Sequence, residues 1–230
     1  VIIDEFHERA FDTDLLLCLL QERRTTRTLA LVVMSATIQA ERVANHIGGV
    51  HLAGSGRTYP IEQRWLPGDA TMPTKRGLEE RLIAALEQCA NDPGDVLVFL
   101  PGKQEIARAA QALDTENAGR RAGHTKWDIA TLHGDMSLRD QGDVLNASAG
   151  PRRRRVVLAT NVAETSLTIP GVGVVIDSGL VRGMVYRAGR GYLSLLPIAR
   201  DSADQRAGRA GRVGPGCASA CGAPRRSSTT

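Results

Sequence analysis

The chain has 230 residues, of which 42% are hydrophobic and 23% charged, and this ordinary balance argues against disorder over most of its length. Its 29 basic and 25 acidic residues give a net charge of +4, which permits a polyanionic partner without requiring one. No apolar run is long enough to span a bilayer and there is no signal-peptide pattern, so no membrane partner is expected.

The first quarter of the chain alternates strand and helix patterns. Strand patterns at 1–3 and 29–34 alternate with helical patterns at 14–24 and 39–47. This order predicts parallel strands covered by helices on both faces. The first strand pattern begins at Val1 rather than after a Met, so we expect the chain to be cut from a longer one.

A stretch rich in glycine and proline at 54–74 breaks the alternation and is typical of a linker. Strand and helix patterns then resume and end in a hairpin at 184–196, turning at 188–191. Helices are expected at 78–89, 103–113 and 138–146, and strands at 95–100, 129–132, 156–159 and 172–176. The predicted fold class is α/β with two parallel-sheet domains: 1–56 in the first, 57–76 as the linker and 77–217 in the second.

Two carboxylates, Asp4 and Glu5, follow the first predicted strand. At the carboxyl end of a parallel strand, one carboxylate can hold a hydrated Mg²⁺ while the next deprotonates a water for attack on a phosphate. An acidic loop leading into a helix explains the pair equally well when it is taken alone. Ser35 and Thr37 follow the next strand, so both strand ends should face the same crevice.

Small hydroxyl and amide side chains follow the strand at 156–159 and include Thr160, Asn161 and Thr165. Such groups can donate to phosphate oxygens, although a capped, Thr-rich turn is the alternative. The neighbouring strand ends at Asp177, which places another carboxylate on the same rim.

The segment 202–212 predicts a helix that begins at Ser202, which has capping-box spacing to Gln205. Arg209 and Arg212 are three residues apart and should share a face, and glycines leave room for another surface. Guanidinium groups aimed at developing phosphate charge would explain this pattern. A basic surface helix that binds nucleic acid directly is the alternative.

A run of four arginines at 152–155 precedes the strand that carries Thr160. A solvated loop and a phosphate contact beside a nucleic-acid path explain this run equally well.

The four cysteines are expected to be reduced thiols. Cys18 and Cys89 lie in apolar helical patterns, and Cys217 and Cys221 have no Cys or His neighbours at zinc-ligand spacing. A cytoplasmic setting is therefore expected.

In this order and at these intervals, the segments at 4–9, 35–37, 159–169 and 202–212 resemble the motifs of superfamily 2 helicases of the DEAH-box type. Further similar segments lie at 56–61, 96–102 and 131–134, and the resemblance covers nearly all of 1–216. Phe6 stands where the usual motif has alanine, a variant similar to the HrpB-like bacterial branch. The resemblance implies two RecA-like domains of the P-loop NTPase type, the first truncated at its N-terminal side.

The resemblance also implies a nucleotide site for ATP. In it Asp4 would hold Mg²⁺, Glu5 would activate water, and Asp177 would face the nucleotide. His7 would connect the acidic motif to Gln205, which would contact the terminal phosphates.

Three further sets of residues complete the implied site. They are the arginine fingers Arg209 and Arg212, the nucleic-acid-binding residues Thr160, Asn161 and Thr165, and the coupling residues Ser35 and Thr37. The hairpin matches a family element near the strand-separation point.

The expected function is ATP-dependent translocation on, or unwinding of, nucleic acid, with RNA favoured over DNA and the oligomeric state left open. The Gly-rich phosphate loop of the family is absent from these 230 residues. We therefore expect this fragment to be inactive as an ATPase by itself. A fragment that only binds nucleic acid, and a translation product without function, are the alternatives.

Beyond 216 the family continues into an aromatic-Arg-Leu-Trp strand, whereas 218–225 shows no strand pattern. One missing base in a GC-rich coding sequence would produce such a change. We therefore predict a frameshift near Ala218 and a disordered tail over 218–230.

Overall fold

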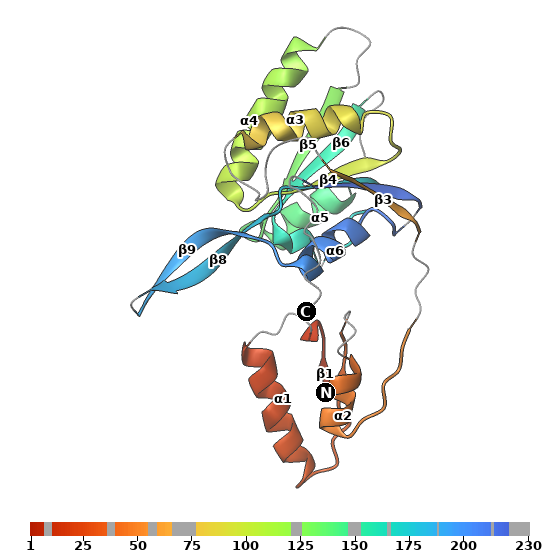
Figure 1. The fold of residues 1–230 in the computed structure, drawn as a ribbon, viewed down its shortest axis with the longest axis vertical. Coiled ribbons are helices and arrows are strands. Elements are labelled where there is room, and N and C mark those ends of the chain that lie inside the picture. The colour runs from red at the N-terminus through yellow and green to blue at the C-terminus, as the bar shows by residue number, and fades with distance from the viewer. Residues whose placement is uncertain are drawn as a thin grey trace. The chain divides into compact units, whose positions relative to one another are not determined.

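The computed structural model describes residues 1–6, 11–35, 40–54, 59–65, 77–120, 126–146, 153–164, 167–187, 189–212 and 214–220. The chain divides into two compact units, Val1–Gly56 and Arg57–Thr230 (Figure 1). Among the helices of these described residues, none is long and apolar enough to span a membrane.

The first unit is built on two short parallel strands, β1 (Ile2–Ile3) and β2 (Val32–Val33). Helix α1 (Phe11–Arg24) follows β1 and helix α2 (Ala40–Ile47) follows β2, as the βαβ pattern predicts. Helix α1 has acidic residues in its first turn and arginines in its last, which suits the helix dipole. Its leucines meet the strands in a small core that contains Ile3, Phe6 and Leu17.

The second unit is built on a six-stranded sheet in which every pairing is parallel. The strand order is β3 (Ile61–Trp65), β10 (Gly216–Ala220), β7 (Val172–Asp177), β4 (Asp95–Phe99), β6 (Arg153–Ala159) and β5 (Lys126–Leu132). The central strands contain continuous buried apolar runs, such as Val96 to Phe99 and Val156 to Ala159, the pattern of strands that are buried on both faces.

Helices cover both faces of this sheet (Figure 1). Helices α3 (Leu78–Gln88) and α4 (Lys103–Gly119) pack on one face, against alternate residues such as Val96 and Val98. Helices α5 (Leu138–Asn146) and α6 (Arg200–Gly208) cover the other face, where residues such as Leu97 and Phe99 point. The predicted α/β, RecA-like class is confirmed.

A β-hairpin leaves the sheet after β7 and projects away from it (Figure 1). Its strands β8 (Leu180–Arg187) and β9 (Arg190–Pro197) pair antiparallel. Gly189 in the turn has a φ of 73°, which favours glycine. The predicted hairpin is confirmed and is longer than its pattern indicates.

Two predicted boundaries are wrong. Residues 61–65 of the expected linker form the edge strand β3, which pairs with β10 along its whole length. Ala218–Ala220, expected in a disordered tail, are part of β10 between β3 and β7. The expected tail at 221–230 lies outside the described residues, and the frameshift stays a prediction.

Candidate functional site

The acidic turn after β1 is held in an unusual backbone conformation. The Glu5 amide donates to the Asp4 carboxylate oxygen Oδ1 at 2.8 Å. Glu5 has a φ of 52°, the only positive φ among the described non-glycine residues. Such a conformation costs about 1–2 kcal/mol, and strain of this kind concentrates at functional sites. The turn therefore presents two carboxylates at the strand end at some expense of stability.

The ends of β1 and β2 lie at the same edge of the first unit's sheet. The Met34 amide donates to the Ile3 carbonyl at 2.8 Å, and the Phe6 amide donates to the Met34 carbonyl at 3.0 Å. The Phe6 side chain is 4% exposed and fills the core beneath the acidic turn. Ser35 consequently follows β2 at the same edge of the sheet as the acidic turn.

Asp4 is exposed and offers carboxylate oxygens, the ligand type that Mg²⁺ prefers. The residue therefore fits the predicted metal role. His7 and Thr37, which were expected near it, lie outside the described residues.

In the second unit, Thr160 follows β6 and Asp177 ends β7, and these two strands flank β4. The Leu100 amide donates to the Ala159 carbonyl at 2.8 Å, and the Ser178 amide donates to the Phe99 carbonyl at 3.1 Å. These bonds align three strand ends on one rim, as the sequence predicts.

Thr160 begins a short 3₁₀ helix at Asn161–Ala163. Thr160 is half-buried and Asn161 exposed, and their side chains make no hydrogen bond with another described residue. Both can therefore donate to an external phosphate. Thr165 lies outside the described residues.

A buried arginine that the sequence analysis did not single out joins this rim to α6. Arg206 is 1% exposed, and its Nε and Nη1 atoms lie 2.9 Å from carboxylate oxygens of Glu164 and Asp177. Its guanidinium group stacks over the Phe99 ring, 4.8 Å from the centroid. Ser202 of α6 also donates to the Glu164 carboxylate. Asp177, an acid at the end of an apolar strand, was the signal that a buried cation is required.

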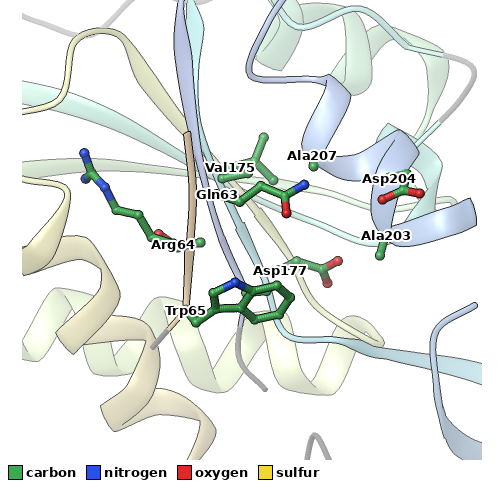
Figure 2. A pocket seen from close by; sticks show the side chains of 11 residues that line it. Gln63, Arg64, Trp65, Val175, Asp177, Ala203, Asp204 and Ala207 are labelled. Carbon is green, nitrogen blue, oxygen red and sulfur yellow. The ribbon is translucent and has the colours of Figure 1, made fainter. Parts of the chain in front are cut away.

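Burial raises the pKa of the Asp177 carboxyl, and the Arg206 charge opposes this rise. Asp177 also accepts a hydrogen bond from the Gly179 amide at 2.8 Å. Its other neighbours line a hollow between the sheet edge and α6 (Figure 2). In Figure 2 the side chains of Gln63 and Asp177 face this hollow, whereas Arg64 points away from it. A ligand could meet Asp177 here, and its contact with a nucleotide stays a prediction.

The two expected arginine fingers both hold the segment after Asn161. Arg209 is 6% exposed and donates to the backbone carbonyls of Glu164, at 2.8 Å, and Leu167, at 2.6 Å. Arg212 is exposed and donates to the Thr168 hydroxyl at 2.9 Å. Arg212 could therefore turn to a phosphate easily, whereas Arg209 would first have to leave two carbonyls.

The helix expected over 202–212 is shorter and begins earlier. Helix α6 starts at Arg200, with Ala199 as its N-cap and no side-chain capping bond, so the predicted capping box is wrong. It ends at Gly208, because glycine weakens a helix. Gly211 then packs closely against the start of β3, where an added Cβ would lie 2.8 Å from Tyr59 O. Gln205 remains on the helix, half-buried and without a side-chain bond to another described residue.

Two members of the arginine run, Arg154 and Arg155, are part of the fold, so neither a solvated loop nor a phosphate contact describes them. Arg155 is 2% exposed; it pairs with Asp95 at 2.8 Å and donates to two backbone carbonyls. Arg154 donates to the carbonyls of Gly94 and Cys89. The run opens β6, so it lies about 20 Å from Thr160 at the other end of that strand.

Arg155→Ser should therefore destabilise the second unit by about 3 kcal/mol, because it leaves Asp95 partly buried without its cation. Arg153→Ser should change stability by less than about 0.5 kcal/mol, because Arg153 is exposed on the same strand. Urea unfolding of the two matched variants checks both values. Equal stabilities would contradict the structural role of Arg155.

One cluster of potential metal ligands occurs among the described residues. Cys89, Asp92 and Cys217 bring one ligand atom each within 4.8 Å of one another. Both Asp92 oxygens, however, accept from the Arg64 guanidinium group. Burial raises the pKa of the Cys217 thiol to about 11, so it remains a neutral thiol rather than the thiolate that a metal needs. We interpret this cluster as part of the core.

The family model described as "Helicase conserved C-terminal domain" matches residues 78–214. The chain is 40% identical over 222 residues to the ATP-dependent RNA helicase HrpA of Escherichia coli (strain K12), covering 94% of this chain and 16% of that protein. It is 39% identical over 228 residues to the ATP-dependent RNA helicase DEAH12, chloroplastic, of Arabidopsis thaliana, covering 94% and 12%.

Among solved structures, the chain is similar to the E. coli DExH-box NTPase HrpB, with a TM-score of 0.81 and 35% identity. The match covers 97% of this chain and 27% of that one. The chain thus spans less than a third of the length of each of these relatives.

Proposed function

We propose that this chain is part of an enzyme that uses ATP to move along or separate strands of RNA. The chain belongs to the DEAH-box helicase family and carries its conserved C-terminal helicase domain. The observation that carries the proposal is the bonding between the rim segment and α6. Glu164 and Leu167, which follow the predicted phosphate-binding residues, are held by Arg206 and Arg209 of the segment that also carries Gln205. A shift at one segment would therefore move the other.

RNA is the proposed nucleic acid, since the similar curated proteins are RNA helicases. Thr160 and Asn161 would contact the backbone, because hydroxyl and amide groups at a rim donate to phosphates without reading bases. Thr165 is proposed for the same role. Reduced, free thiols at Cys18, Cys89 and Cys217 support the cytoplasm as the compartment.

The proposed nucleotide is ATP with Mg²⁺. When bound, the metal ion would neutralise charge on the phosphates, and Asp4 is the residue that would hold it. Glu5 would take a proton from the attacking water, and His7 would connect this motif to Gln205. Arg212 and, after release from its carbonyls, Arg209 would stabilise negative charge on the terminal phosphate. Ser35 and Thr37 would couple the nucleotide to strand movement.

A binding measurement tests the nucleic-acid part. Asn161→Ala should weaken the binding of a labelled single-stranded RNA by about tenfold, because it removes one hydrogen bond from the Asn161 amide to a charged phosphate. Asn91→Ala is the matched control, since Asn91 is exposed in the turn between α3 and β4, at the amino end of β4 rather than on the rim that carries Asn161. Equal affinities for both variants would remove the proposed contact.

The alternative, a fragment that binds RNA and never turns over ATP, predicts the same RNA result. The two functions differ in their response to nucleotide. In a fragment that only binds RNA, a labelled ATP analogue would neither weaken nor strengthen RNA binding. Titration of both ligands on one sample therefore separates the two functions.

A further inference from the structure

The outer part of the hairpin is exposed. Met184, Tyr186, Tyr192 and Leu193 are each at least half exposed, at 55%, 75%, 51% and 60%. A two-stranded ribbon is marginally stable by itself, so its direction depends on how its base is attached. An element that is to meet a nucleic-acid strand needs a defined direction.

The base is fixed by the backbone and by two apolar side chains. The Ile198 amide donates to the Gly179 carbonyl at 3.0 Å, and Ser178 is bonded to the end of β4. Leu180 and Ile198 are 2% and 8% exposed. These contacts determine where the ribbon leaves the sheet, but all lie at its first residues and allow it to swing.

A buried carboxylate on α4 reaches further along the ribbon. Glu105 is 0% exposed, and Arg182 of β8 places Nη2 at 3.1 Å from its Oε1 and 3.3 Å from its Oε2. Arg108 donates to the same Oε1 at 3.0 Å. A fully buried carboxylate is stable only with such partners, and Arg182 is one of the two arginines that pair with it.

Gly102 makes room for this link. It is the N-cap of α4, and an added Cβ would lie 2.7 Å from Arg182 Nε and 3.1 Å from Arg182 Cδ. Its φ of −174° is open to any residue, so glycine is needed here for space and not for backbone conformation. The arginine therefore passes directly over the N-cap of α4 before it reaches Glu105.

We propose that Arg182 is a positioning residue that sets the direction of the hairpin by bridging β8 to Glu105 across Gly102. The inference deepens the proposed function, since it assigns the residue that would aim the hairpin at the strands. It also ties the hairpin to the end of β4, next to the rim that carries Thr160 and Asp177.

Paired spin labels test the direction without any nucleic acid. Labels are placed at Tyr192→Cys on the ribbon and Gln111→Cys on α4, in a chain with Cys18→Ser and Cys221→Ser. With Arg182 and Glu105 unchanged, the two labels should give one narrow distance distribution. Arg182→Met should broaden it by about twofold or more, because the ribbon is then held only at its base. Arg187→Met, which removes the same charge from the exposed outer ribbon, should leave it narrow.

Two further variants distinguish positioning from general loss of structure. Gly102→Ala keeps both charges but blocks the path, and should broaden the distribution like Arg182→Met. Arg182→Lys keeps a cation near Glu105 and should restore much of the narrow distribution. Thermal unfolding of each variant shows whether the sheet is intact.

A narrow distribution in a folded Arg182→Met chain would overturn the proposal. So would broadening by Arg187→Met to the same extent. If Arg182→Met broadens the distribution but the unaltered chain binds no RNA, the positioning role of Arg182 stands and the proposed function is contradicted instead.

Discussion

Replacing Arg206 with methionine is expected to lower the free energy of unfolding of the second unit by about 3–5 kcal/mol, the usual cost of breaking a buried ion pair. The substitution leaves Glu164 and Asp177, each 2.9 Å from the guanidinium group, without their shared cation. Methionine has no guanidinium group to place over the Phe99 ring, so the loss includes this cation–π contact as well as the two ion pairs. A domain typically has about 5–15 kcal/mol in total. Urea unfolding followed by fluorescence of Trp127, which is 5% exposed, measures the change.

Arg212→Met is the matched control. Arg212 is exposed and has one bond to the Thr168 hydroxyl, so its loss should change stability by less than about 0.5 kcal/mol. Adding Glu164→Gln and Asp177→Asn to Arg206→Met removes all three charges and should recover part of the loss. A single Arg206→Met variant as stable as the control would show that the network contributes little.

Local sequence patterns determined most of the fold. Strands β4, β6 and β7 each contain a continuous apolar stretch, such as Val96 to Phe99 or Val156 to Ala159, so their position was readable without any partner. Strand β10 was not readable, because Cys217–Ala220 has little β-propensity. It is a strand because β3 and β7 flank it, and because Gly216 lets the chain pass Ala210 closely.

The candidate site was predictable to the extent that topology alone brings residues together. Parallel strands place their carboxyl ends on one rim, so the positions of Thr160 and Asp177 followed from the strand order. The partners of an arginine do not follow in this way. Arg206 meets Glu164 across 42 residues, and Arg155 meets Asp95 across 60. Such pairs depend on which side chain is desolvated, and this is known only once the helices are packed.

The structure also changes how the two arginine fingers are to be understood. Arg209 and Arg212 both bind the segment 164–168. A phosphate that bound either guanidinium group would therefore have to replace its bonds to this segment. Arg209 is buried and makes the more extensive contacts, so its release would have the larger effect on that segment.

The second large effect concerns catalysis. The 230-residue chain by itself should show no measurable ATP hydrolysis, although it carries Asp4, Glu5 and Arg212. Phosphoryl transfer depends on holding the phosphates in line with the water, and a Gly-rich phosphate loop contributes much of this hold. That motif does not occur in these 230 residues. Release of inorganic phosphate, measured with Mg²⁺ and with and without RNA, checks the expectation. Hydrolysis that is lost on Glu5→Gln would contradict it.

In a protein where the same residues follow a phosphate loop, Glu5→Gln should reduce hydrolysis by about 100-fold or more, the usual contribution of a general base, and leave ATP binding intact. The amide is isosteric with the carboxylate, so the turn at φ 52° should be unchanged. Glu5→Gly removes the same carboxylate but relaxes that backbone conformation. It should be equally inactive and at least as stable as Glu5→Gln. Because both variants lack the base and only one relieves the strain, equal loss of hydrolysis would assign the effect to the carboxylate rather than to the turn. A Glu5→Gly enzyme that still hydrolyses ATP at the original rate would show that another group takes the proton.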